Sequence, residues 1–414
     1  MLPPEVRGQV SALGTADIVV GLPSYDNADT IGGVLDAVRA GLQKHFDGAR
    51  AVLVCSDGGS TDETRAQVDG VDWDAPRILA HHEVPPEEQV AVPYHGVPGR
   101  GAAHRTILEV AYLLGARACV LVGADCRSIT PEWIDRLLRP ILDDDHDWVA
   151  PLYQRHRYEG TLTSGLVSPL VGALYGRRIR QPLAGEAGLS GRLVAHLCRK
   201  EGWDGDLVRH GITLWGLATA VTEQFSLCEA WLGPYVVDAR GRRTELGATL
   251  SHVMDSVFAL QVQTAEAWGE VRGCQPVPVV GRRLPLGLWS VELNVTGMIR
   301  AFRLGLKDLL PVWEQVLAPD TLADVLALGF TTDEGHGFPH ALWARVVYDF
   351  AVGYRGRVLY RQHLLRSLVP LYLGRTAAFI RETASGGARE AEAWIEAGCR
   401  AFEREKAYLL ARWP

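Results

Sequence analysis

The chain has 414 residues, 47% of them hydrophobic and 22% charged, which is the composition of an ordinary globular protein with material for two domains. A formal net charge of -7, with no block of basic residues, argues against a nucleic-acid partner. Seven scattered cysteines without CxxC spacing, no leader-like N-terminus and no apolar run of membrane-spanning length predict a reduced, cytoplasmic protein without a membrane span.

The first part of the chain alternates short apolar runs with helix-like segments. Strands are predicted at residues 16–23, 51–57, 77–84, 118–125 and 148–154, and helices at 30–46, 61–68, 99–116 and 130–144. This alternation predicts an α/β fold with a mostly parallel, doubly wound sheet, in which ligands bind at the carboxyl ends of the strands. Three polar turns follow strands and would share that edge: PSYDNADT, SDGGSTDET and GADCRS.

The second part changes character. Helices are predicted at residues 161–174 and 189–200, a Gly-rich turn QPLAGEAG at 181–188, and a strand at 225–233. From residue 248 to the end the segments are long and amphipathic, which predicts an all-helical domain. The Pro/Gly-rich segment 273–290 is expected to cross the catalytic face. The domains are therefore predicted as 1–247, catalytic, and 248–414, helical, with the helical domain as the surface through which two copies would pair.

Asp125 is the first candidate for chemistry, because it ends the strand ACVLVGAD. A single aspartate at a strand end is more often a turn former than a metal ligand. Here it shares an edge with SDGGSTD and PSYDN, and a divalent cation that bridges a diphosphate needs hard oxygen ligands on its protein side. The pattern favours a metal-dependent nucleotide site.

The motifs PSYDNADTI, SDGGSTDET, PGRGAAHRTIL, GAD, QPLAGEAG and DARGRRTELGA occur in this order. The sequence resembles the GT-A glycosyltransferases, and among them the retaining enzymes that make glucosyl-3-phosphoglycerate, glucosylglycerate and mannosylglycerate. The resemblance covers most of residues 16–255, and residues 337–354 resemble the helical tail of the mannosylglycerate enzymes. It implies a Rossmann-like GT-A domain, Mg²⁺ or Mn²⁺ as cofactor, a UDP-, GDP- or ADP-hexose as donor, and D-glycerate or a similar small hydroxy acid as acceptor.

The resemblance also implies residue roles at the donor site. Residues of the first loop, the second turn and the GAD turn would contact the nucleoside: Pro23, Ser24, Tyr25, Asn27, Asp57, Gly58 and Ala124. Arg100 stands where relatives have the Lys of PGKG and would neutralise phosphate charge at a helix N-terminus. Gly185 and Glu186, matching PLGGE, would accommodate and bind sugar hydroxyls; the alternative is an acidic first turn of a helix.

The sequence departs from the pattern of these glycosyltransferases at two positions of the expected metal site. Gly123 replaces the first acid of the family's DxD, which leaves Asp125 as the ligand at this strand end. Matching ELGA to Glu245–Ala248 places Asp238 where relatives have a metal-binding His, and an Asp there would favour Mg²⁺ or Mn²⁺. The alternative is an exposed loop acid next to Arg240.

The last expectations concern the acceptor site and the stereochemical course of the transfer. In the acceptor turn, where the phosphoglycerate enzymes carry an Arg, this chain offers Thr161 and Thr163, with Arg240 as a cation. Thr213 occupies the position at which inverting relatives place a carboxylate base, so a retaining course is expected. Asp204 and Asp206 are nearby acids that would permit inversion.

Three alternative functions stay open. One is a glucosyl-3-phosphoglycerate synthase. A second is a nucleotidyltransferase, although PSYDNADT lacks the Gly- and Arg-rich phosphate loop that this class usually has after its first strand. A third is a non-catalytic nucleotide-sugar binding module, which the incomplete DxD favours. Metal-dependent hydrolysis of a nucleotide sugar would separate an enzyme from a binding module.

Overall fold

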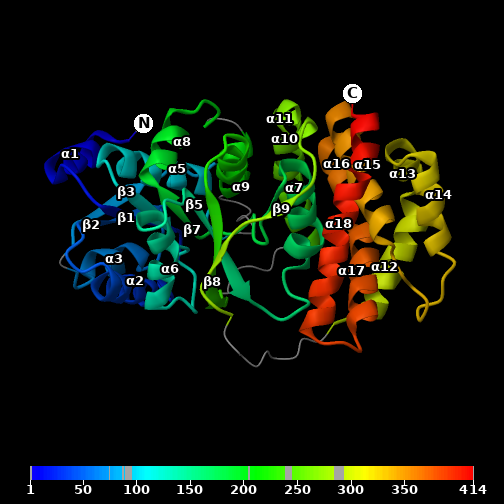
Figure 1. Ribbon diagram of the computed structural model, residues 1–414, viewed down its shortest axis with the longest axis horizontal. Coiled ribbons are helices and arrows are strands. Elements are labelled where there is room, and N and C mark those ends of the chain that lie inside the picture. Colours follow the sequence, from blue (N-terminus) through cyan, green and yellow to red (C-terminus); the bar gives the residue numbers. More distant parts are fainter. Residues whose placement is uncertain are drawn as a thin grey trace. The chain divides into compact units, whose positions relative to one another are not determined.

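The computed structural model describes residues 2–73, 75–85, 88, 96–203, 206–237, 245–283 and 293–413, without the side chains of 206–211. Its contacts divide the chain into two compact units (Figure 1). The first, here called the sheet unit, comprises Met1–Gln154, Gln181–Thr244 and Val277–Pro285; the second, the helical unit, comprises Arg155–Arg180, Glu245–Pro276 and Leu286–Pro414. Each unit is thus built from several stretches of chain, whereas the domain prediction has a single boundary after residue 247.

The sheet unit is built on an eight-stranded sheet within the described residues, in the order β10-β8-β5-β7-β4-β1-β2-β3. The antiparallel strand is β7, which pairs with β4 on one side and β5 on the other, while the remaining pairs are parallel. The mostly parallel α/β sheet predicted from the sequence is confirmed. The strands are β1 (Ile18–Ser24), β2 (Ala51–Asp57), β3 (Arg77–His81), β4 (Ala118–Leu121), β5 (Trp148–Gln154), β7 (Ala187–Ser190), β8 (Leu227–Pro234) and β10 (Val279–Val280).

Helices cover this sheet because its central strands are apolar on both faces, as parallel sheets require. Every residue of β1, β2, β4 and β5 is buried. In the core, Trp133 and Leu137 pack with Val120, Val149 and Ala230 of three different strands. The helices of the unit are α1 (Pro4–Leu13), α2 (Ile31–His45), α3 (Thr64–Gly70), α5 (Arg100–Leu113), α6 (Pro131–Leu142), α8 (Gly191–Arg199) and α9 (Asp206–Thr222).

Strand β7 corrects one prediction, because the segment from Leu189 was expected to be helical. The chain instead forms an extended strand up to Ser190, whose Oγ accepts a 3.1 Å hydrogen bond from the Leu193 amide and starts α8. Gly188 makes this strand possible: a Cβ there would lie 2.1 Å from the Leu137 carbonyl oxygen, so β7 passes closer to α6 than a side chain permits.

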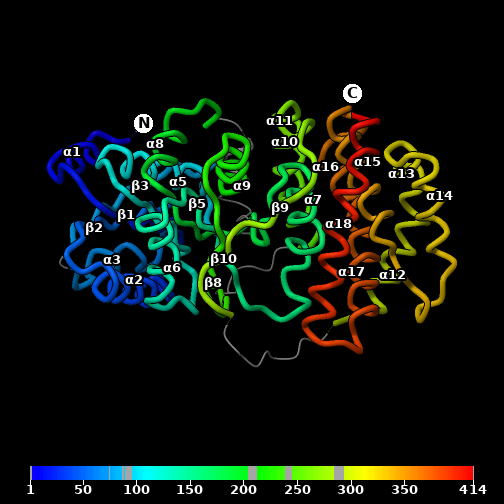
Figure 2. Tube along the Cα trace, viewed as in Figure 1, coloured from blue at the N-terminus to red at the C-terminus, as the bar shows by residue number. Residues whose placement is uncertain are grey.

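The Pro/Gly-rich segment before residue 284 contributes two short strands. In Figure 2 the tube of β10 runs beside β8, and Val279 and Val280 pair in parallel with Glu229 and Ala230. Strand β9 (Gln275–Pro276) pairs with β6 (Arg177–Arg178) in the helical unit. The remainder of the segment, 284–290, lies outside the described residues.

The helical unit confirms that the C-terminal part is all-helical apart from these short strands. Its helices are α7 (Ser168–Tyr175), α10 (Leu246–Gln263), α11 (Ala265–Gly269), α12 (Val295–Asp308), α13 (Leu310–Val316), α14 (Pro319–Leu328), α15 (His340–Gly356), α16 (Arg361–Ser367), α17 (Val369–Thr383) and α18 (Ala388–Arg412), and a π-helical turn, Thr163–Val167, precedes α7. None of the described helices combines the length and apolarity that a bilayer crossing requires.

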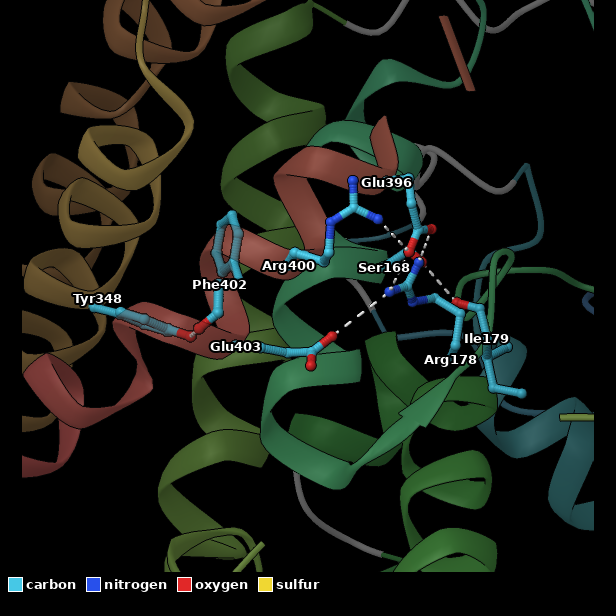
Figure 3. A network of polar contacts seen from close by, with 8 residues as sticks. All are labelled: Ser168, Arg178, Ile179, Tyr348, Glu396, Arg400, Phe402 and Glu403. Atoms are coloured by element: carbon cyan, nitrogen blue, oxygen red, sulfur yellow. Dashed lines mark hydrogen bonds and ion pairs between the residues drawn. The ribbon is translucent and has the colours of Figure 1, made fainter. Parts of the chain in front are cut away.

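Figure 3 shows why the segment around α7 belongs with the C-terminal helices. Arg178 forms ion pairs with Glu396 and, at 3.6 Å, with Glu403, both on α18. The Arg178 side chain is 16% exposed, so these pairs hold a charge that is largely removed from solvent. Nearby, the Tyr348 hydroxyl donates to the Phe402 carbonyl at 2.6 Å and joins α15 to α18.

Candidate functional site

The turns after β1 and β2 are joined into one platform at the carboxyl edge of the sheet. The amide of Asp26 donates to Ser60 Oγ at 2.9 Å, and the amide of Thr61 donates to Asp26 Oδ1 at 2.8 Å. The amide of Asn27 donates to Thr64 Oγ1 at 2.7 Å. Each turn satisfies the backbone donors of the other through short polar side chains, which is why this edge is rich in Asp, Ser and Thr.

Asp57, predicted to contact the base, shapes the second turn. It is 0% exposed, and its Oδ1 accepts from Ser24 Oγ at 3.0 Å and from Ser60 Oγ at 2.5 Å. Its Oδ2 accepts from the amides of Gly59 and Ser60 at 3.0 and 2.9 Å. Four hydrogen bonds fill the acceptor capacity of a carboxylate, so in this arrangement Asp57 fixes the backbone on which a ligand would rest.

His82 packs against the turn after β2. It was not identified from the sequence. The ring is 3% exposed, with Nε2 2.9 Å from the Pro98 carbonyl and Nδ1 3.1 Å from Ser56 Oγ. Since a carbonyl only accepts, Nε2 carries the proton and Nδ1 accepts from the serine. Burial lowers the pKa of His82, which keeps it neutral. A Cβ at Gly58 would lie 3.0 Å from this ring, so the glycine packs against protein as well.

The other predicted nucleoside contacts differ in exposure. Tyr25 and Asn27 are partly exposed, whereas Pro23, Ser24 and Ala124 are buried. Asn27 Oδ1 accepts from the Tyr25 amide at 2.8 Å, so the Asn27 side chain orders this loop. Tyr25 and Asn27 are therefore the members of this set whose side chains could contact a ligand at the surface. The buried members could affect ligand binding only through the backbone conformation that they set.

Asp125 and Glu186 meet at the middle of the edge. Glu186, directly before β7, is 1% exposed, and its Oε2 accepts a short hydrogen bond from the Tyr153 hydroxyl. A Cβ at Gly123 would lie 2.9 Å from Asp125 Oδ1 and 3.0 Å from Glu186 Oε1. The two carboxylates thus point at one place, and Gly123 leaves that place open.

Arg100 brings a positive charge to the same region. It is the first residue of α5, after Gly99 in a left-handed conformation with φ 66°. A Cβ at Gly185 would lie 2.2 Å from Arg100 Nη2, so the guanidinium rests on the backbone next to Glu186. One turn along α5, burial and then the charge of Arg100 hold the pKa of His104 well below its usual range. A helix N-terminus with a guanidinium is suited to phosphate oxygens.

The loop that leads to Asp238 is tied to the loop that carries Asp125. Cys126 and Val237 form an isolated antiparallel bridge, and the Arg127 amide donates to the Val236 carbonyl at 2.8 Å. Asp238 follows Val237 directly in the sequence but lies outside the described residues, as does Arg240.

The residues present fit a divalent cation that a substrate completes. Within the described part of the chain no group of three or more His, Cys, Asp or Glu side chains is arranged for a metal. Mg²⁺ is commonly held by one or two carboxylates together with phosphate oxygens of a substrate, and Asp125 supplies one such carboxylate at the strand end.

The residues predicted for catalysis and for the acceptor belong to other elements of the chain. Thr213 is half-buried in α9, and no hydrogen bond joins it to Asp125 or Glu186 among the described residues. Asp206 begins the same helix, and its side chain lies outside the description, as does Asp204.

Thr161 and Thr163 belong to the helical unit, where Thr161 Oγ1 lies 2.6 Å from the Tyr372 hydroxyl. A Cβ at Gly160 would lie 3.2 Å from Arg155 Nη1, so a guanidinium accompanies this turn although the turn itself carries none. Arg155 was not identified from the sequence, because the contact depends on the fold of the turn.

Similarity to known proteins is found at the level of structure and not of sequence. No family model and no curated protein sequence matches the chain. Similar solved structures include glucosyl-3-phosphoglycerate synthase from Mycobacterium tuberculosis with Mn²⁺, UDP-glucose and phosphoglyceric acid, at 22% identity and a TM-score of 0.45 over 70% of this chain and 91% of that chain. The same synthase with Mg²⁺ and UDP is 21% identical, with a TM-score of 0.45 over 63% and 83% of the two chains.

Proposed function

We propose that this protein is a metal-dependent GT-A glycosyltransferase that moves a hexose, glucose or mannose, from a nucleotide-diphosphate sugar to D-glycerate or a similar small hydroxy acid. The observation that carries the proposal is the approach of Asp125 Oδ1 and Glu186 Oε1 to within 2.9 and 3.0 Å of the place that a Cβ of residue 123 would occupy, with Arg100 beside them. A carboxylate for a cation, a guanidinium for phosphate and a second carboxylate for sugar hydroxyls are the groups that such a donor needs.

The donor would lie along the strand ends. Tyr25 and Asn27 would contact the nucleoside above the turn that Asp57 orders. Arg100 would neutralise the diphosphate, and Glu186 would accept from sugar hydroxyls through Oε1, since Oε2 is held by Tyr153. Mg²⁺ or Mn²⁺, held by Asp125 and Asp238, would supply positive charge to the leaving diphosphate.

Retention of configuration is the course we propose for the transfer. The acceptor hydroxyl oxygen bonds to the anomeric carbon while the bond from that carbon to the diphosphate oxygen breaks, and the hydroxyl proton passes to the leaving phosphate on the same face. The placement of Thr213, a residue without a carboxylate, at the position of an inverting base supports this course. Asp204 or Asp206 as a base would support inversion instead.

The first test is Asp125→Ala, with the exposed Asp69→Ala of α3 as a matched control. We expect Asp125→Ala to abolish Mn²⁺-dependent binding of the nucleotide sugar in calorimetry and to abolish transfer, because it removes a hard ligand at the strand end. Unchanged Mn²⁺-dependent binding in this variant would show that the metal assignment is wrong.

Asp238 is tested separately. Asp238→Ala should weaken metal binding, and Asp238→His should restore most of it, since imidazole also binds Mn²⁺. Equal metal affinity of the wild type and the Ala variant would make Asp238 an ordinary loop residue.

The acceptor separates the proposal from a second candidate, glucosyl-3-phosphoglycerate synthesis. Thr161 and Thr163 with Arg240 would bind one small carboxylate, and the absence of an Arg from the turn should cost about 1.5–3 kcal/mol of phosphate binding. Arg155 Nη1 lies 3.2 Å from where a Cβ of residue 160 would be, and a guanidinium at this turn favours the phosphorylated acceptor. Glycerate and 3-phosphoglycerate in competition for one donor decide between them, and a clear preference for 3-phosphoglycerate would overturn the glycerate assignment.

Product analysis tests the two other classes. A nucleotidyltransferase would release pyrophosphate or a nucleoside monophosphate, and a binding module would leave the nucleotide sugar intact in the presence of Mn²⁺. The transferase releases a nucleoside diphosphate and a glycosylated acid, which mass spectrometry identifies directly. A panel of UDP-, GDP- and ADP-hexoses in the same assay identifies the donor.

A further inference from the structure

The helical unit contains a small cavity between the π-helical turn, α17 and α18. Its walls include Thr161, Tyr372, Arg375, Phe379 and Trp394, all of which belong to this unit. The cavity volume is about 10 Å³, which is room for one group the size of a water molecule.

Arg375 is the unusual member of this wall. Its residue is 4% exposed, and the guanidinium lies 3.8 Å from the centre of the Trp394 ring. Its Nη1 donates to the Phe338 carbonyl and its Nη2 to His340 Nδ1 at 2.5 Å. Nε is buried and has no hydrogen-bond partner among the described residues. A fully buried cation is therefore bonded only to neutral acceptors, which is costly without an opposing charge.

Among the described residues no carboxylate lies within ion-pair distance of the Arg375 guanidinium, and Glu382 is the acid whose charge raises the pKa of Arg375 against the effect of burial. Glu382 is exposed and accepts from Trp394 Nε1 at 2.7 Å, so the indole ring separates it from the guanidinium. Arg400 and Arg404 act with Arg375 and with burial to lower the pKa of His340 to about 4. The local potential is positive, and burial lowers the pKa of Arg375 itself to about 9.

Hydroxyl groups complete the cavity. Thr161 Oγ1 and the Tyr372 hydroxyl lie 2.6 Å apart, so one of the two donates to the other, and Tyr372 is also hydrogen-bonded to Thr376. A buried N–H of a guanidinium beside hydroxyl groups and aromatic walls forms a site that favours an anion over water, because the anion offsets the buried charge.

We propose that this cavity binds one small monovalent anion, either chloride or the carboxylate group of a short organic acid, in contact with Arg375 Nε–H. The cavity size excludes larger groups from direct contact, and a single buried positive charge is matched by a single negative one. The site lies wholly in the helical unit, and its defining group is Arg375, which the proposed function does not use; Thr161 is shared with the proposed acceptor turn.

The experiment observes Arg375 directly in the full chain labelled with ¹⁵Nε-arginine. The Nε–H resonance of Arg375 is identified by its loss in Arg375→Lys. Chloride, D-glycerate and inorganic phosphate are then titrated separately, with gluconate replacing the anion at constant ionic strength. We expect a saturable shift of this resonance with chloride or glycerate and none with gluconate. Saturation by chloride alone identifies an inorganic anion, and displacement of chloride by glycerate identifies a carboxylate.

Two variants sharpen the result without removing the arginine. Thr161→Val keeps the shape but loses the hydroxyl, so the anion should bind about threefold to tenfold more weakly. Arg381→Gln removes a charge from the same helix outside the cavity, where Arg381 donates to the Glu334 carbonyl, and should leave the affinity unchanged. The absence of a saturable shift with both chloride and glycerate, or equal loss of affinity in both variants, would overturn the proposal.

Discussion

Gly123 is the residue at which sequence comparison and geometry lead to opposite expectations. The family pattern has an acid here, so Gly123→Asp would look like a repair. In the structure a Cβ at this position meets Asp125 Oδ1 at 2.9 Å and Glu186 Oε1 at 3.0 Å, and the new carboxylate would be the third negative charge in a mostly buried place. Both oxygens would have to move, and Glu186 is held by Tyr153.

We therefore predict that Gly123→Asp lowers the free energy of unfolding by about 1–3 kcal/mol in the absence of metal. Gly123→Ala should show the steric part alone. Urea denaturation of both variants, with and without Mn²⁺, makes the measurement. A Gly123→Asp protein as stable as the wild type without metal would mean that the two carboxylates do not converge.

Asp57 gives a second prediction at this scale. Asp57→Asn keeps the shape but leaves a neutral amide with one oxygen to serve four donors, two of which are backbone amides. We expect a loss of about 1–3 kcal/mol of stability and weaker nucleotide binding, because the turn loses its order. Asp69→Asn, an exposed change, is the control. Unchanged thermal unfolding and nucleotide affinity would show that the turn does not need the carboxylate.

The candidate site could be predicted in part from single residues. Asp125 was identified as a candidate from its place at a strand end, and Arg100 and Glu186 from their match to the PGKG and PLGGE motifs of the glycosyltransferases that the sequence resembles. Their convergence could not be predicted, since it depends on β7 running antiparallel between β4 and β5 and so bringing Glu186 to the strand end of Asp125. His82 was missed because a buried histidine in an apolar strand end has no sequence signature of its own.

At the scale of elements, the start of α5 and the turn before β7 form one contact. The Arg100 guanidinium lies where a Cβ of residue 185 would be, so the conformation of the turn decides where the helix presents its charge. Gly185→Ala places a methyl group 2.2 Å from Arg100 Nη2 and must push the guanidinium aside.

We predict that Gly185→Ala and Arg100→Gln weaken nucleoside diphosphate binding by similar factors, about tenfold each, and that the double variant is little worse than either. Calorimetric titration with UDP, GDP and ADP in the presence of Mn²⁺ measures the cycle. Gly33→Ala, at an exposed position of α2 where a Cβ meets nothing within 4 Å, serves as a control of glycine replacement. Independent, additive losses would show that the turn does not act through Arg100.

The boundaries of the predicted strands and helices show which sequence patterns predict secondary structure. The strands of the N-terminal half were predicted because runs such as those of β2 and β5 are mostly apolar, and both strands are buried over all seven residues. Strand β7 was divided between the predicted turn at 181–188 and the predicted helix from Leu189, because its four residues, AGLS, carry neither alternation nor β-branched side chains. Tertiary packing of Gly188 against α6, which sequence periodicity does not record, determines this strand.

At the scale of the whole molecule, the order of the sequence patterns predicted the mostly parallel sheet and the helical C-terminal part. It did not predict which stretches of the chain make up each unit. Residues 155–180 join the C-terminal helices through long-range contacts such as Arg178 with Glu396 and Glu403. No local signal marks these partners, since they are more than two hundred residues apart in the sequence.

Both units hold histidines with lowered pKa, buried in the sheet unit and half-buried at His340 in the helical unit, and this affects the stability of the whole protein. Burial lowers the pKa of His82 and of His104 in the sheet unit, and burial with the neighbouring arginines lowers the pKa of His340 to about 4 in the helical unit. Each folded-state pKa lies below the unfolded value near 6.5, so the unfolded chain binds more protons below that pH. Both units should therefore lose stability as the medium becomes acidic.

For His340 we predict that the free energy of unfolding falls by about 1–3 kcal/mol between pH 6.5 and pH 4, and that this contribution is complete above pH 6.5. His340→Asn keeps an acceptor for Arg375 but does not titrate, so it should lose part of the acid sensitivity, whereas the exposed His363→Asn should not. Hydrogen exchange of amides in α15 and α17 at several pH values reports on the helical unit separately from the sheet unit. If the pH dependence of those amides were the same in wild type and His340→Asn, the buried neutral state of His340 would not be the cause of the acid sensitivity.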